Sequence, residues 1–184
     1  TAAHWGGQGL HPRGNFEGFM RAASENKWLE AHGLEHWTEF YTDYGVLLQK
    51  RFFDYFLKGL DNGWDEQPRV QLQIRKIDGF EQRHEQDWPI PRTQWTSFYL
   101  HENLSLSTQK PVSSATLSFD AKEDGLTFYS EPLSTDMEIT GPSAFQGMIS
   151  SSTKDADLFI VLQVFSPDNE EIVFQGAIDP NTPI

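Results

Sequence analysis

Two histidines lie four residues apart in the sequence HGLEH, which spans residues 32–36. The spacing matches the H-x-x-E-H pattern of one class of zinc peptidases, in which both histidines bind the metal and the glutamate, here Glu35, activates water. That chemistry requires the five residues to lie on one helix, so that both imidazole rings share a face. Gly33 stands inside the pattern, and residues 28–31 before it are typical of a strand, so the zinc interpretation is weak.

Two other interpretations of these histidines stay open on the residues alone. In one, His32 and His36 are packed or solvated in a loop among aromatic residues and have no chemical role. In the other, His36 is the general base of a serine-type hydrolase, because a histidine just past the end of a strand can be held rigidly while its ring faces a pocket. No partner nucleophile is apparent beside it.

The elements predicted around these histidines are mostly helical. A short helix is predicted from residue 14 or 15 to residue 23, because aromatic and methionine side chains recur there on one face. A short buried strand is predicted over residues 28–31. The clearest prediction is a helix over residues 44–58, whose apolar residues recur at three- and four-residue steps. Thr42 and Asp43 supply its cap, and Gly59 ends it.

A polar, turn-rich segment over residues 60–68 predicts a linker, after which the apolar period changes to two. Strands are predicted at residues 70–74, 115–119, 137–139 and 158–165, and a turn at 166–170 predicts a hairpin return. The nearly continuous apolar run LFIVLQVF is typical of a central strand that is covered on both faces. Several short strands between Pro, Gly and Ser clusters predict a jelly-roll β-sandwich.

Composition limits the classes of function. The chain is 38% hydrophobic and 14% aromatic, which is typical of a globular protein. Its formal net charge of −13 argues against nucleic acid and anionic membranes as partners, since both require a basic surface. Cysteine is absent, which removes disulfides, thiolate catalysis and cysteine-based zinc sites from this sequence and fits an intracellular protein without proving one.

The combination of the segments WGGQGLHPRGNFEGF, KWLEAHGLEHWTEFYT and KRFFDYFLKGLDNG resembles the end of the catalytic domain in the CocE/NonD hydrolases, the cocaine-esterase and Xaa-Pro dipeptidyl-peptidase-like family. The resemblance continues in the family's order through VQLQIR, DWPIP and WTSFYL to ITGPSAFQGMISSSTKDADLFIVLQVFSPDNEEIVFQGAIDP, which is similar to the family's C-terminal jelly-roll domain. It implies that residues 1–62 form the C-terminal part of an α/β-hydrolase domain. Residues 63–184 would form an incomplete jelly-roll domain.

The resemblance also implies a Ser-Asp/Glu-His triad, with the serine on a G-x-S-x-G elbow. His36 matches the family's catalytic histidine, and no G-x-S-x-G occurs in these residues, so we expect the serine upstream in a longer protein. Relatives that keep the acid place an Asp two residues after the Trp that matches Trp5, where this chain has Gly7. Glu17, on the following helix, is one candidate for the acid. An acid from another strand outside this sequence is the other.

We therefore expect part of a serine hydrolase that cleaves acyl esters or Xaa-Pro dipeptidyl bonds through an acyl-enzyme, with neither cofactor nor metal. Its expected partners are a small-molecule or peptide substrate and the rest of its own parent chain, and a homo-oligomer is compatible with the resemblance. By itself the present sequence should be inactive. The alternatives are a non-catalytic jelly-roll binding or scaffolding module and the weak zinc peptidase interpretation. The substrate, the triad acid and the compartment stay open.

Overall fold

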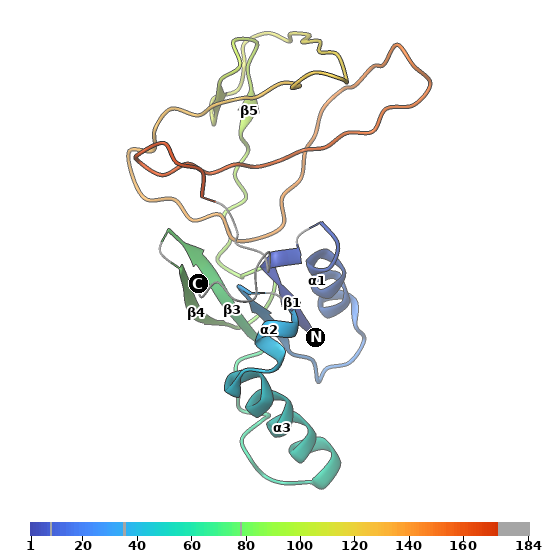
Figure 1. Ribbon diagram of the computed structural model, residues 1–184, viewed down its shortest axis with the longest axis vertical. Helices are drawn as coiled ribbons and strands as arrows, with labels where there is room; N and C mark the ends of the chain where they lie inside the picture. Colours follow the sequence, from blue (N-terminus) through green and yellow to red (C-terminus); the bar gives the residue numbers. More distant parts are fainter. Residues whose placement is uncertain (8, 35, 78, 173–184) are drawn as a thin grey trace. The chain divides into compact units, whose positions relative to one another are not determined.

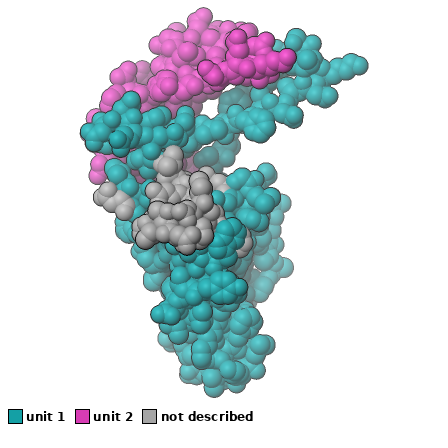
Figure 2. Space-filling view, in the orientation of Figure 1, with its two compact units in different colours: residues 1–91, 141–184 teal, residues 92–140 magenta. Residues whose placement is uncertain are grey.

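The computed structural model describes residues 1–7, 9–34, 36–77 and 79–172, and for His36 it describes the backbone alone. The chain divides into two compact units. One consists of residues 1–91 together with 141–184, and the other of residues 92–140 (Figure 2). The mixed α/β content that the sequence predicts is confirmed, and nearly all regular elements lie in residues 1–91.

A four-stranded mixed sheet organises the first unit (Figure 1). Its strands are β1 (Ala2–His4), β2 (Leu29–His32), β3 (Val70–Lys76) and β4 (Gly79–Glu85), and they lie in this order. β1, β2 and β3 are parallel, whereas β4 is antiparallel to β3. Parallel strands require crossover connections, and here the two connections carry the helices.

The first crossover contains the short 3₁₀ helix η1 (Trp5–Gly7) and the helix α1 (Pro12–Arg21). The helix predicted here is confirmed, but it begins earlier than predicted, because Pro12 occupies a first-turn position that suits its fixed backbone angle. Phe16 and Phe19 are buried, and α1 packs on β1 and β2. This helix therefore covers the sheet next to the candidate histidines.

The second crossover contains α2 (His36–Phe40) and α3 (Asp43–Lys58). α3 confirms the clearest prediction from the sequence. The Thr42 hydroxyl accepts a hydrogen bond from Gly45 N–H at its start, and Gly59 has φ 65° at its end, the left-handed conformation that glycine tolerates best. The buried Asp54 carboxylate pairs with both Lys50 and Lys58.

The hydrophobic core is built on the sheet. Every second side chain of β1, β2 and β3 points into the core. Apolar residues of α1 and of the segment after β4 pack against them. Its members are Ala3, Phe16, Phe19, Leu29, Ala31, Val70, Leu72, Ile74, Trp88 and Ile90. The strand predicted at 70–74 is thus confirmed as β3, with Val70, Leu72 and Ile74 facing inward.

The sheet continues across the position where the sequence predicts a domain boundary, between residues 62 and 63. β3 begins after the predicted linker and pairs with β2, so that Leu29 lies opposite Val70 and Ala31 opposite Leu72. The linker itself has no helix or strand. Any division of the parent protein into domains has to accommodate this pairing.

Most of the predicted jelly-roll strands are wrong as strands in this structure. Residues 115–119, 137–139 and 158–164 form no strand, and in the described part of residues 92–172 the only strands are β5 (Tyr99–Leu100) and β6 (Leu106–Ser107). The apolar run at 158–165 is exposed, with Phe159 at 91% and Val161 at 75%. A strand needs a neighbour to exchange hydrogen bonds with, and apolar residues do not supply one.

The turn at residues 166–170 is confirmed. Ser166 N–H donates to the Glu170 carbonyl, and Phe165 forms an antiparallel bridge with Glu171. The remainder of the predicted hairpin return, from residue 173, lies outside the described residues. Within the described part of the chain, no helix has the length and apolar character needed to cross a membrane.

Candidate active site

The candidate site lies at the carboxyl ends of β1 and β2, where α/β sheets commonly bind ligands. His4 ends β1 and His32 ends β2, and the two are neighbours in the parallel register. Their rings are stacked, with centroids 6.0 Å apart and planes 21° apart. Both residues are buried, each with 5% exposure. The sheet therefore brings together two histidines that are 28 residues apart in the sequence.

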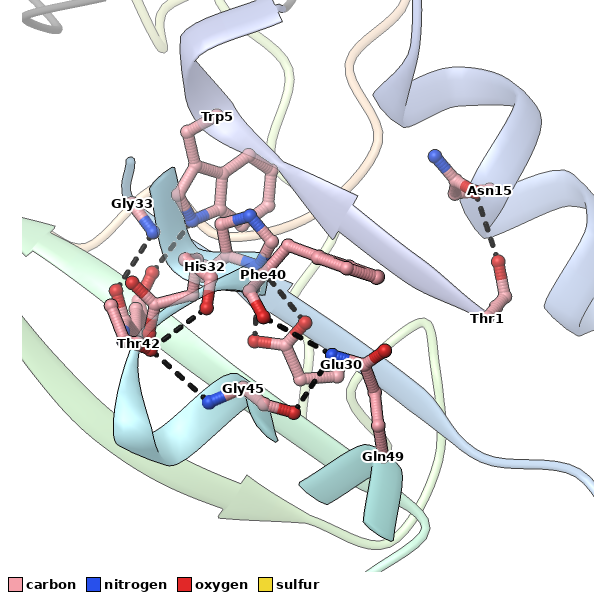
Figure 3. Close-up of polar contacts among 12 residues, drawn as sticks. Thr1, Trp5, Asn15, Glu30, His32, Gly33, Phe40, Thr42, Gly45 and Gln49 are labelled. Atoms are coloured by element: carbon pink, nitrogen blue, oxygen red, sulfur yellow. Dashed lines mark hydrogen bonds and ion pairs between the residues drawn. The ribbon is translucent and has the colours of Figure 1, made fainter. Parts of the chain in front are cut away.

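His32 forms a carboxylate–histidine pair with Glu30 (Figure 3). Residues two apart on a strand share a face, and His32 Nδ1 lies 2.9 Å from Glu30 Oε2. The other ring nitrogen, Nε2, is buried and has no hydrogen-bond partner within the described part of the chain. The carboxylate fixes the orientation of the imidazole ring, as the acid of a catalytic triad does.

The His4 ring occupies the space next to Gly7. A Cβ atom added at Gly7 would lie 2.3 Å from His4 Cε1 and 2.9 Å from His4 Nε2. It would also lie 3.2 Å from His11 Cδ2. Glycine at position 7 therefore fits the structure, because any larger side chain there would overlap the His4 ring unless that ring moved.

Gln73 on β3 connects the segments around this site. Its backbone carbonyl accepts a 2.7 Å hydrogen bond from Trp5 Nε1, and its side-chain Oε1 accepts a 2.8 Å bond from Gly33 N–H. Gly33 is packed against Phe80 so closely that an added Cβ would lie 2.4 Å from that ring. β3 and β4 therefore hold the start of the segment that follows β2.

Burial dominates the electrostatics of α2 and the start of α3 near this pair. Burial raises the pKa of the Glu39 carboxyl; the nearby His32 opposes that effect, as does the side chain of Gln73, whereas the Glu30 charge adds to it. Burial likewise raises the pKa of the Tyr44 hydroxyl, with further contributions from Glu30 and Glu39. Glu30 is hydrogen-bonded to His32, and Glu39 interacts with His32 electrostatically.

The sequence predicts two site residues, and both stay predictions. His36 is the first residue of α2, directly after the segment that leaves β2, and its side chain lies outside the described residues. Glu17 lies on α1, where its Oε2 accepts a 2.6 Å bond from Arg21 Nε in a solvent-exposed pair. That contact occupies the Glu17 carboxylate within its own helix.

The helix that the zinc interpretation requires is not formed. His32 ends a strand and His36 begins a helix, with Gly33 and Leu34 in a bend between them. The pattern therefore does not place its residues on one helical face. Among the described residues, no group of three or more His, Asp or Glu side chains is arranged to hold a metal ion.

Sequence reasoning missed His4, Glu30 and Gln73. It gave His32 no carboxylate partner, whereas the structure pairs it with Glu30. The alternation of Glu30 and His32 on a predicted strand was the signal that could have found this pair. No comparable signal exists for Gln73, which is 40 residues from Gly33 and beyond the predicted linker.

A family model described as the X-Pro dipeptidyl-peptidase C-terminal non-catalytic domain matches residues 62–182. The chain belongs to this family. Its match covers β3, β4 and most of the second half of the chain. The N-terminal elements that carry the candidate histidines precede the matched residues.

The chain is also similar to two hydrolases. It is 27% identical to the cocaine esterase of Rhodococcus sp. (strain MB1 Bresler), a match that covers 71% of this chain and 29% of the esterase. Two solved structures of a CocE/NonD family hydrolase from Staphylococcus aureus match with 41% identity and a TM-score of 0.58, covering 61% of this chain and 21% of that protein. These matches confirm the resemblance to CocE/NonD hydrolases. The matched regions make up less than a third of either relative.

Proposed function

We propose that this chain is part of a serine hydrolase that cleaves ester or amide bonds through an acyl-enzyme. The observation that carries the proposal is the combination of hydrolase relatives with a βαβ sheet edge that ends in histidines. The nucleophilic serine would come from outside this chain. The substrate would be an acyl ester or an Xaa-Pro dipeptidyl compound.

In this proposal His36 is the general base. The serine Oγ would attack the substrate carbonyl while His36 takes its proton, and His36 would return that proton to the leaving group. Backbone N–H groups from elsewhere in the parent protein would hold the oxyanion. What supports His36 is its place at the start of α2, just beyond the carboxyl end of β2. Glu17 stays one candidate for the acid, and an acid from another strand outside this sequence stays the other.

The proposed fold of the parent protein follows the same resemblance. The three parallel strands with helical crossovers support the end of an α/β-hydrolase sheet in the first part of the chain. The family match over residues 62–182 supports a jelly-roll domain after it. The further partners in this proposal are the rest of the parent chain and, for the oligomer, a second copy.

A second candidate function is a non-catalytic binding or scaffolding module. Two observations favour it: the matched family is described as non-catalytic, and the space at Gly7 holds the His4 ring instead of an acid. Under this alternative the parent protein keeps the fold of a hydrolase without its turnover.

Fluorophosphonate labelling of the intact parent protein separates the two functions. We expect a labelled serine, hydrolysis of p-nitrophenyl esters or of an Xaa-Pro p-nitroanilide, and loss of about 1,000-fold or more in kcat for His36→Ala. His84→Ala, at an exposed position on β4, is the matched control and should keep the wild-type rate. An intact protein without a labelled serine would rule out the hydrolase and favour the binding module.

Glu17→Gln tests the predicted acid in the same assay. If Glu17 orients the catalytic histidine, kcat should fall by at least about tenfold. Glu25→Gln, an exposed carboxylate just after α1, is the control. Equal rates for the Glu17 variant and the wild type would assign the acid to another residue.

A further inference from the structure

We propose that the apolar run at residues 158–165 is a self-association surface, on which a second copy of this chain adds an antiparallel strand. The run pairs with its own copy about a two-fold axis at Leu162. The inference does not depend on the hydrolase chemistry proposed above. It assigns a surface to the second copy that the proposed function names as a partner.

The run is apolar and exposed to solvent. Seven of its eight side chains are hydrophobic, and their exposed fractions range from 40% at Phe165 to 91% at Phe159. No helix or strand forms over residues 158–164 (Figure 1). Monomeric proteins rarely leave a contiguous apolar segment of this kind uncovered, so it indicates an interaction site.

The backbone of the run is open to pairing along one edge. Among the described residues, its backbone is bonded only at its C-terminal end, where Ile172 N–H donates to the Val164 carbonyl and Phe165 forms an antiparallel bridge with Glu171. Bonds in an antiparallel pair alternate along each strand, so this bridge uses the edge that residue 164 faces. When the run is extended, the opposite edge is faced by the backbone groups of residues 159, 161, 163 and 165. A strand from another chain can add to that edge.

The sequence of the run is self-complementary in one antiparallel register. With Leu162 opposite its own copy, the facing pairs are Phe159 with Phe165, Ile160 with Val164, and Val161 with Gln163. The first and third of these pairs join residues whose backbone groups face the free edge, as hydrogen-bonded pairs require. Cross-strand aromatic and β-branched neighbours stabilise such a pair. Because both copies contribute the same residues, the contact is isologous and closes as a dimer.

Charge beside the run favours antiparallel over parallel pairing. A parallel pair in register would place Asp155 opposite Asp155 and Asp157 opposite Asp157, and like charges directly opposite each other destabilise strand pairs. In the antiparallel register about Leu162, Asp157 lies opposite the uncharged Pro167. The net charge of −13 still repels the two copies from each other, so added salt should strengthen the dimer.

Single-cysteine variants test this register, because the chain has no cysteine of its own. Leu162→Cys should form an intermolecular disulfide in oxidised glutathione, since the Cα atoms of a pair that is not hydrogen-bonded are about 4.5 Å apart. Phe159→Cys should not, because the two copies of residue 159 lie about 20 Å apart in this register. A mixture of Phe159→Cys and Phe165→Cys chains should form the disulfide again.

Sedimentation velocity and amide hydrogen exchange on the 184-residue chain measure the association itself. We expect a concentration-dependent dimer, in which exchange over residues 159–165 slows by about tenfold or more. Leu162→Lys should weaken dimerisation by about tenfold or more, because it places two like charges opposite each other at the axis. Ile149→Lys is the matched control: Ile149 is 55% exposed and Leu162 60%, and the variant should dimerise as the wild type does.

Two results would overturn the proposal. A chain that stays monomeric at all concentrations would exclude the second copy, and slow exchange over the run in that monomer would assign its cover to another segment of the same chain. Disulfide formation by Phe159→Cys alone would exclude the antiparallel register and indicate parallel, open-ended stacking. Neither result bears on the proposed hydrolase function, which serine labelling of the intact parent protein tests separately.

Discussion

At the residue scale, His4 and Gly7 depend on each other. The His4 ring fills the volume that a side chain at position 7 would take, so an acid there would force the ring to move. The resemblance implies an Asp at position 7, and the His4 ring leaves no room there for a side chain unless the ring moves. This overlap also predicts that the effects of substitutions at positions 4 and 7 on stability are not additive.

Gly7→Asp in the intact protein should be destabilising by about 1–3 kcal/mol, because it overpacks the space beside the buried His4 ring, and it should not raise kcat. His4→Gly combined with Gly7→Asp should recover part of that loss, which a double-mutant cycle in urea unfolding would measure. Gly14→Asp is the control, because an added Cβ meets nothing within 4 Å there. Additive losses at positions 4 and 7 would contradict the coupling.

The buried pair of Glu30 and His32 leads to a second residue-scale prediction. Glu30→Leu leaves the Nδ1 of a 5% exposed histidine without its carboxylate partner and should destabilise the protein by about 1–3 kcal/mol. Glu25→Leu, at an exposed position, should change stability by less than about 0.5 kcal/mol. Equal melting temperatures for the two variants would argue against a structural role for the pair.

At the element scale, Thr42 joins α2 to α3. Its hydroxyl donates a 2.7 Å bond to the Glu39 carbonyl and accepts a 3.1 Å bond from Gly45 N–H. Thr42→Ala should therefore cost about 1 kcal/mol in the free energy of unfolding, the typical value of an N-cap. Thr38→Ala, exposed on α2, is the control, and a Thr42 variant no less stable than it would contradict the capping role.

The elements also differ in how far local sequence decides them. α3 is predictable because its cap, its apolar spacing and the glycine after it all lie within residues 42–59. β3 is predictable from alternation, and it forms because β2 and β4 pair with it on either side. The run at residues 158–164 is more apolar than β3, yet it forms no strand. Among the described residues, its backbone is bonded only at its end, where Ile172 N–H donates to the Val164 carbonyl.

At the scale of the whole molecule, the 184 residues hold one sheet edge of the proposed site and not the proposed nucleophile. We expect the isolated chain to hydrolyse p-nitrophenyl acetate no faster than buffer does, whereas the intact parent protein should turn it over. His36→Ala in both proteins is the control. Measurable turnover by the isolated chain that His36→Ala abolishes would contradict this expectation.

The predicted boundary after residue 62 is also a question for the whole molecule. It stays a prediction, and the pairing of β2 with β3 links the residues on its two sides. Gln73 and Phe80 come from beyond that boundary and contact Gly33 before it. If the domains are separate in the parent protein, these contacts belong to whichever domain contains the sheet.

The sequence by itself determined the family, the helices around the candidate site and the position of β3, because each depends on residues that are close together in the chain. Which residues contact one another in the candidate site was decided by tertiary structure alone. His4 reaches His32 through parallel strand register, and Gln73 reaches Gly33 across 40 residues. Register and long-range pairing arise from burying one shared sheet, a constraint that no short sequence pattern contains.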